Sequence, residues 1–158
     1  MLSYGVPQLF DVCLSSGIVF ITVWFFFIQS PFLFNVLGRN RFVPIMMKMT
    51  QLFFDTMVIL NLAVFGVSFL TAGLATHTLA ALVAVSATLF NTYVIVPRAL
   101  AAGKASAVER AKNENTSSVK DFAIEGGSKT ETKTLHQTVV AFVLVMVGGL
   151  IMHILLMK

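Results

Sequence analysis

Asp55 has the clearest potential for chemistry, because it interrupts an apolar stretch that runs from 46 to 71. A lone carboxylate in hydrocarbon costs about 2.5–3.5 kcal/mol, so we expect it to be paired, protonated or turned toward the interior of a helix bundle. At about 1.5 Å of rise per residue, Gln29, Asn91 and Thr92 of two other apolar stretches are predicted to lie with Asp55 in the inner third of the bilayer. His136 is predicted at the inner mouth of the fourth helix. Together with Asp55 these residues form a predicted intramembrane polar cluster.

Two interpretations of this cluster remain open. The functional one is an ion, proton or lipid head-group path built on Asp55 and His136. The structural one is hydrogen bonding between helices, which contributes about 0.6–2 kcal/mol per contact in membrane bundles. Arg98 has the same ambiguity, because it can extend to the membrane surface or form a salt bridge with Asp55.

Other residue types that carry chemistry are sparse. His77 and His153 are both predicted near one end of the bundle, where they could approach each other as haem ligands, whereas His136 and His153 are 17 residues apart. That separation is about 25 Å along one helix, too far for one haem. Cys13 is the only cysteine, and no P-loop, zinc-protease, hydrolase or haem-attachment motif occurs. We therefore predict no catalytic activity, no metal and no cofactor.

The elements that position these residues are four apolar stretches, at 9–37, 46–71, 79–96 and 138–157. Each approaches or exceeds the ~20 residues with which a helix crosses about 30 Å of hydrocarbon. With 57% hydrophobic and 11% charged residues, the chain has too little polar surface for a soluble protein. We predict an all-α integral membrane four-helix bundle, a single domain over 1–158 with a hydrophilic loop at 98–135.

Two further features refine this bundle. Pro31 is expected to kink the first helix, because it removes a backbone hydrogen bond. Small residues recur in the other three helices at spacings that favour close helix contact. They are Gly66, Ala80, Ala81, Ala84, Ala87, Gly148 and Gly149.

The basic residues predict an orientation. Of the 11 Lys and Arg residues, nine lie in the first and third connections between the apolar stretches, and Lys48 lies just inside the start of the second stretch. By the positive-inside rule both connections face the cytosol, or the matrix of a mitochondrion, and both termini face the opposite side. The predicted interface anchors are Arg39, Arg41, Lys48 and Arg98. No basic residue precedes the first stretch, so we expect no cleaved leader, and the choice between the mitochondrial inner membrane and another eukaryotic membrane stays open.

Segment 91–98, Asn-Thr-Tyr-Val-Ile-Val-Pro-Arg, is followed by an Ala-rich run that ends at Glu109 and Arg110. With 24–34, the basic turn 39–42 and the Leu-His-Gln of 135–137, it resembles the transmembrane protein 205 family of small four-span membrane proteins. The chain departs from that family at 46–49, where Met-Met-Lys-Met replaces the usual Phe-Pro pair. The resemblance implies the architecture, a loosely defined role in trafficking or drug resistance, and no active site.

These observations leave two functional hypotheses. The first is a non-catalytic structural or accessory subunit, whose partners are the lipid bilayer and other membrane protein subunits. The second is a small oligomeric transporter or channel-like protein, with Asp55, Asn91 and His136 along its path. The net charge is +4, but the basic residues cluster beside helix ends rather than in a basic domain, so no nucleic-acid partner is expected.

Overall fold

The computed structural model describes residues 5–102, 104–105 and 128–157. Within this part every regular element is helical: α1 (Val6–Val23), η1 (Trp24–Gln29), α2 (Ser30–Ala72), α3 (Thr76–Phe90), η2 (Asn91–Ile95) and α5 (Ser128–Leu156). Four helices are long and apolar enough to cross a membrane, over Val6–Gly38, Ile45–Ala72, Thr76–Ala102 and Lys133–Leu156. The predicted all-α four-helix bundle is therefore confirmed.

The predicted spans differ from the observed helices mainly at the hydrophilic loop. Helical structure continues past Pro97 to Ala102, and α5 already begins at Ser128. The predicted hydrophilic loop of 98–135 is thus helical at both of its described ends, and the Ala-rich run after Pro97 favours helix at the first of them. The interior of the predicted loop, 106–127, lies outside the described residues.

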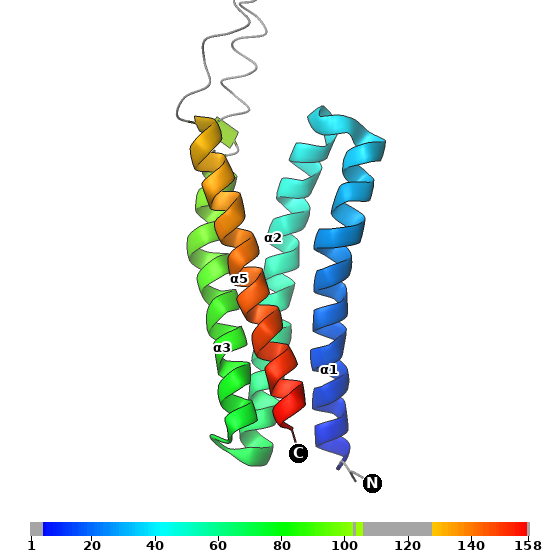
Figure 1. Ribbon diagram of the computed structural model, residues 1–158, viewed down its shortest axis with the longest axis vertical. Coiled ribbons are helices and arrows are strands. Elements are labelled where there is room, and N and C mark those ends of the chain that lie inside the picture. Colours follow the sequence, from blue (N-terminus) through cyan, green and yellow to red (C-terminus); the bar gives the residue numbers. More distant parts are fainter. Residues whose placement is uncertain (1–4, 103, 106–127, 158) are drawn as a thin grey trace, which may run out of the picture.

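The four spans form a ring in which α1 contacts α2 and α5, and α3 contacts the same two helices. Both termini lie at one end of the bundle, which we call the terminal end (Figure 1). At the opposite end the chain reverses near Gly38, whose φ of 65° and ψ of 164° interrupt the helix between the first two spans. A positive φ is accessible to glycine at little steric cost.

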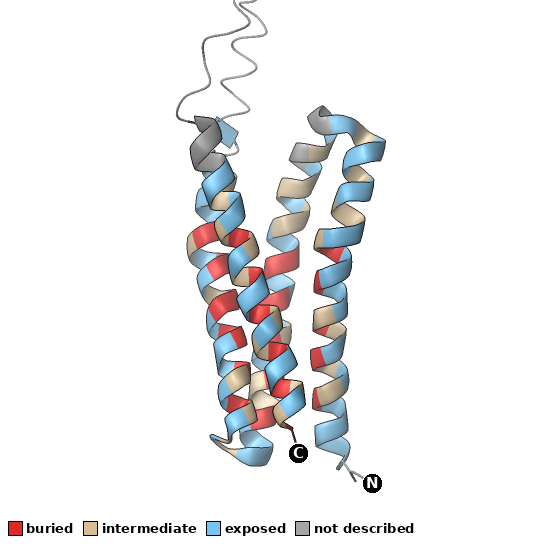
Figure 2. Ribbon diagram, viewed as in Figure 1, coloured by how far each residue is buried: buried red, intermediate tan, exposed pale blue. Residues whose placement is uncertain are grey.

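Buried side chains follow the inner faces of the helices along much of their length (Figure 2). The core includes Ile18 of α1, Phe54 and Val64 of α2, and Met146 and Leu150 of α5, each at most 1% exposed. The outer faces carry equally apolar side chains such as Leu62 and Leu155. Such an apolar exterior is favourable in contact with lipid, whereas it would be unfavourable in contact with water.

Each of two π-helical segments lies just before a proline. Segment η1 ends at Gln29 ahead of Pro31, and η2 ends at Ile95 ahead of Pro97. A proline ring clashes with the carbonyl four residues earlier and donates no hydrogen bond, and the wider π-turn gives that carbonyl room. The kink predicted at Pro31 thus takes the form of a local π-turn within a continuous helix.

Close packing of α3 against α5 depends on Gly149. A Cβ atom at this position would lie 3.1 Å from the Ala80 carbonyl oxygen, 3.1 Å from the Ala84 nitrogen and 3.2 Å from the Ala84 Cβ. At neighbouring Gly148 an added Cβ would meet nothing within 4 Å. The small residues predicted to allow close helix contact therefore do so at Gly149, Ala80 and Ala84, and not at Gly148.

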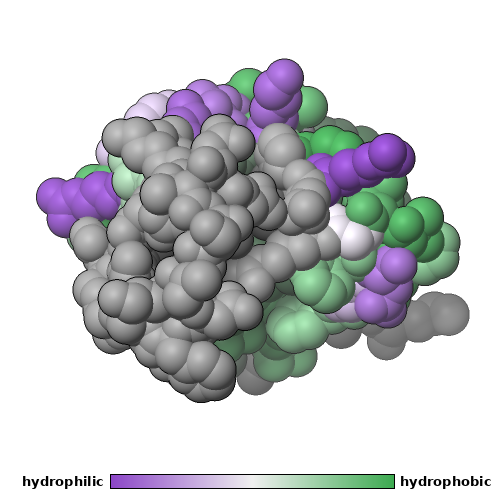
Figure 3. All heavy atoms as spheres, turned by 90° about the horizontal axis from the view of Figure 1, so that it is seen from above, coloured by the Kyte–Doolittle hydropathy of each residue, from purple (hydrophilic) through white to green (hydrophobic). Residues whose placement is uncertain are grey.

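The end of the bundle opposite the termini carries the described basic residues that are exposed. Seen from this end, hydrophilic residues lie around the rim, next to apolar ones (Figure 3). They include Arg41, Lys48, Arg98, Lys104 and Lys133, all exposed. Exposed basic side chains at this position are consistent with the predicted role of Arg41, Lys48 and Arg98 as interface anchors. The side chain of Arg39, the fourth predicted anchor, lies outside the described part.

Candidate functional site

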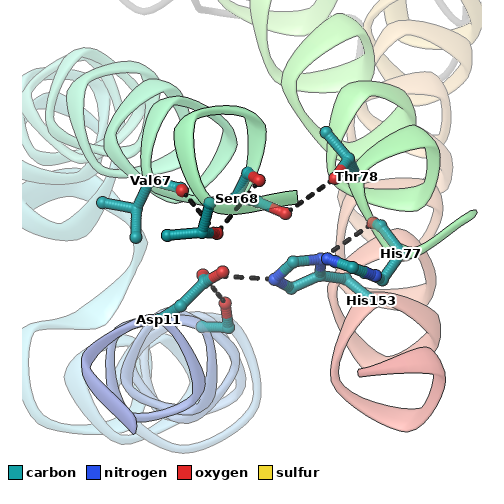
Figure 4. A network of polar contacts seen from close by, with 8 residues as sticks. Asp11, Val67, Ser68, His77, Thr78 and His153 are labelled. Carbon is teal, nitrogen blue, oxygen red and sulfur yellow. Dashed lines mark hydrogen bonds and ion pairs between the residues drawn. The ribbon is translucent and has the colours of Figure 1, made fainter. Parts of the chain in front are cut away.

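A buried aspartate and a buried histidine meet at the terminal end of the bundle. The Nε2 of His153 on α5 lies 3.1 Å from the Oδ1 of Asp11 on α1, and the two side chains are 0% and 2% exposed. The Nδ1 of His153 lies 2.8 Å from the backbone carbonyl oxygen of His77 at the start of α3. We call Asp11, Ser15, His77 and His153 the terminal cluster (Figure 4).

Helical spacing brings a second polar side chain of α1 to the same carboxylate. Ser15 follows Asp11 by one turn, and its hydroxyl lies 3.5 Å from the Asp11 Oδ1. Residues i and i+4 share a helix face, so both point to the bundle interior, where Ser15 is 0% exposed. The carboxylate is therefore fixed by α1 itself and by α5.

The fourth helix joins this end through a separate hydrogen bond. Ser68 of α2 and Thr78 of α3 lie 2.9 Å apart through their hydroxyl oxygens, and both side chains are fully buried. With the Asp11–His153 contact and the His77 carbonyl, polar contacts at the terminal end connect all four helices (Figure 4). At minimum, this layer fixes the helices relative to one another.

The proximity of His77 and His153 does not make a haem site. Their ring centroids are 5.7 Å apart with a 48° interplanar angle. Both ring nitrogens of His153 already face protein acceptors, so neither is available to iron without breaking a buried hydrogen bond. In the described part of the chain, no group of three or more His, Cys, Asp or Glu residues is arranged to hold a metal ion.

The predicted intramembrane polar cluster is not assembled. Asp55 and His136 are exposed on the outside of the bundle, Gln29 is half-buried, and Asn91 and Thr92 are buried. Among the described residues, no hydrogen bond or ion pair joins any two of these five, and none joins Arg98 to Asp55. Depth along a helix does not determine the direction in which a side chain points.

The two buried members of that set are bonded elsewhere. The Asn91 amide donates to the Val139 carbonyl oxygen of α5 at 3.2 Å, and the Thr92 hydroxyl donates to the Thr88 carbonyl oxygen at 2.8 Å. The Asn91 contact joins two helices, whereas the Thr92 contact stays within one. The structural interpretation thus holds for Asn91, whose Oδ1 nevertheless has no partner.

Asp55 faces outward because the inner face of α2 is occupied by other residues. Phe54, Met57, Asn61, Val64 and Ser68 are buried at spacings of three and four, which define one helical stripe. Asp55 lies on the opposite side with exposed residues one and two turns away. These are Gln51, Leu52, Ile59 and Leu62. Among the described residues, no side chain contacts its carboxylate by a hydrogen bond or ion pair.

No family model, curated protein or solved structure matches this chain. The resemblance to the transmembrane protein 205 family accordingly stays a prediction, and its proposed pattern at Glu109 and Arg110 lies outside the described residues. Functional assignment depends on the geometry alone, which offers one internal pair at Asp11 and His153 and one external carboxylate at Asp55.

Sequence analysis missed Asp11 as a site residue. Its only signal is that it is a carboxylate within the apolar stretch 9–37, six residues after Gly5, where it is easily interpreted as an interfacial residue. His153 carried a similar signal, because it interrupts an otherwise uncharged terminal stretch. An acid and a base in two different spans, both near the same membrane face, could have suggested a pair.

Proposed function

We propose that this chain is a non-catalytic accessory subunit that binds another membrane protein through the outward face around Asp55. The observation that carries this proposal is the exposed carboxylate of Asp55 in the middle of an apolar span. The buried polar side chains of the terminal cluster form hydrogen bonds within the chain, whereas the exposed Asp55 faces the surroundings of the bundle.

The depth of Asp55 makes lipid a poor neighbour. It follows Ile45, the first residue of its span, by ten residues, which places it about 15 Å along the helix. The 28-residue span is about 42 Å long, so Asp55 lies about 5 Å from its middle, inside a hydrocarbon layer of about 30 Å. A carboxylate there costs about 2.5–3.5 kcal/mol, and a protein partner that bonds it removes that cost.

The neighbours of Asp55 define the chemistry of the partner. Gln51, one turn earlier, adds an amide, while the Thr56 hydroxyl is already donated to the Leu52 carbonyl oxygen at 2.8 Å. Beyond Asp55 the face is apolar, with Ile59 69% and Leu62 46% exposed. A complementary surface is a transmembrane helix with an Arg or Lys at this depth and apolar residues toward the terminal end.

The alternative of a transport path around Asp55 has less support within a single chain. Its proposed companions Asn91 and His136 form no hydrogen bond or ion pair with Asp55 among the described residues. A path at Asp55 would therefore have to lie between subunits, so association is the first property to test.

Replacement of Asp55 by asparagine is expected to release the chain from its assembly. The native membrane is dissolved in a gentle detergent, complexes are separated on a native gel, and the partners that comigrate are identified by mass spectrometry. We expect D55N to reduce co-migration at least about tenfold, equivalent to about 1.4 kcal/mol, because the amide cannot form an ion pair.

D11N is the matched control, since it makes the same chemical change at a buried position that faces the chain's own helices. It should leave co-migration unchanged. Wild-type chain that migrates alone, or D55N that remains in the complex like the wild type, would contradict the proposed association.

We further propose that the basic connections lie on the cytosolic or matrix side. In a chain with Cys13→Ser, a single cysteine is placed either at Lys104 or at Val6, which is 83% exposed at the terminal end. An impermeant thiol reagent added from the cytosolic or matrix side should label K104C and spare V6C, and detergent should make both reactive. Selective labelling of V6C would reverse the orientation.

A further inference from the structure

We propose that Asp11 and His153 form a binding site for one exchangeable proton, and that loss of this proton loosens the terminal end of the bundle. This inference is independent of the proposed association at Asp55. It depends on the hydrogen-bond geometry of the terminal cluster and on its burial.

The hydrogen-bond geometry requires two protons between His153 and its acceptors. A backbone carbonyl oxygen can only accept, so the 2.8 Å contact with His77 assigns a proton to the His153 Nδ1. The 3.1 Å contact between Nε2 and the Asp11 Oδ1 needs a second proton, on either the nitrogen or the oxygen. A neutral histidine beside an ionised aspartate has only the first of these protons, so the pair holds one more.

The charge of the pair changes with that proton. With it, the pair is neutral overall, either as imidazolium and carboxylate or as imidazole and carboxylic acid. Without it, the Nε2 lone pair faces the carboxylate and a negative charge remains on a side chain that is 2% exposed. An unpaired buried charge is strongly unfavourable, so the deprotonated state favours separation of α1 from α5.

Among the described residues, the groups packed around His153 supply no replacement for the proton. From α3, the His77 ring lies 5.7 Å away, and from α1 only Asp11 is ionisable and in contact. The neighbouring α2 residues Ser68 and Thr71 are hydroxyls, already bonded to Thr78 and to backbone carbonyls of their own helix. Within the described part of α5, His153 has no charged residue beside it.

The His77 ring lies beside the site, 5.7 Å from the His153 ring. It is half-buried in the first turn of α3, at the end of the bundle where both termini lie. The His77 carbonyl contacts Nδ1, so the exchangeable proton at Nε2 lies on the other side of the His153 ring, toward Asp11 (Figure 4). A second positive charge on His77 would oppose one on His153, so the His77 ring can influence how firmly the proton is held.

The sign of the pH effect follows from these states. At mildly acidic pH the pair is neutral and both His153 hydrogen bonds are made, so stability is greatest. As the pH rises and the shared proton is lost, stability falls, because the open state binds this proton more weakly than the closed state does. The pH profile of stability therefore has an alkaline limb, over which stability falls as the pH rises.

The test compares wild type, D11N and D55N in detergent micelles from mildly acidic to alkaline pH. As the pH rises, the ratio of folded to unfolded protein in SDS should fall at least about tenfold for wild type and for D55N. D11N should lack this limb, because the side-chain amide that it introduces can donate to a neutral Nε2 and satisfy the same geometry at every pH. An unchanged alkaline limb in D11N would overturn the proposal.

A second measurement does not depend on the folding of a variant. In ¹⁵N-histidine-labelled wild type, His153 is assigned as the signal that disappears in H153Q. Its ring shifts should change over the same pH range as the loss of stability. A His153 signal that stays constant through that range would overturn the proton site, and neither result depends on whether Asp55 binds a partner.

Discussion

Replacement of Gly149 by leucine is expected to force α3 away from α5 and to prevent a stable bundle. The Cβ alone would lie 3.1 Å from two backbone atoms of α3, the Ala80 carbonyl oxygen and the Ala84 nitrogen. Backbone atoms within a helix cannot rotate aside as the end of a flexible side chain can. We expect a loss of about 3 kcal/mol or more in the free energy of unfolding, the upper range of overpacking effects.

Gly148 supplies the matched control, because leucine there has open space around its Cβ. Both substitutions change helix propensity alike, so the difference between G148L and G149L isolates the contact with α3. Denaturation in mixed detergent micelles measures both variants. Equal stability of the two variants would contradict the close approach of α3 and α5 at this point.

The spans were predictable from the sequence because a membrane imposes a minimum apolar length. The predicted 46–71 and the observed Ile45–Ala72 differ by one residue at each end. The rotation of each helix was not predictable in the same way. In a soluble helix an apolar stripe marks the core, but here the exposed Ile59 and Leu62 are as apolar as the buried Met57 and Val64.

This lack of amphipathic contrast explains the error at Asp55. Its depth was inferred from helix rise, whereas its outward direction depends on which α2 side chains fit against α1 and α3. Phe53 illustrates the point, since its ring stacks on Phe25 at 4.3 Å and helps to determine the rotation of α2. Such packing depends on side chains from different helices and has no signature within one segment.

The approach of His77 and His153 was predicted, but the contact of His153 with Asp11 could not be derived from local spacing. Asp11 and His153 are 142 residues apart, so no local spacing connects them. Their contact also requires that α1 and α5 be neighbours in the ring, which the order of the helices permits but does not require. By contrast, the i and i+4 spacing of Asp11 and Ser15 is visible in the sequence, and it marks the inner face of α1.

Replacement of His153 by phenylalanine is expected to destabilise the bundle more than replacement of Asp11 by leucine. H153F keeps the packing bulk but leaves the Asp11 carboxylate buried without its histidine partner, and breaking a buried pair in this way costs about 3–5 kcal/mol. In D11L the histidine can become neutral and still donate its Nδ1 proton to the His77 carbonyl oxygen. Loss of His153 is therefore expected to lower the stability of the bundle more than loss of Asp11.

The double variant D11L/H153F separates a paired charge from simple packing. Because it removes the carboxylate together with its partner, it should recover most of the stability that H153F loses, as hydrophobic replacement of buried ion pairs often does. H136F, at an exposed histidine of the same helix, should change stability little. All four variants are compared by denaturation in mixed micelles at mildly acidic pH. Additive losses in the double variant would show that Asp11 and His153 stabilise the bundle independently, and would leave their 3.1 Å contact without energetic weight.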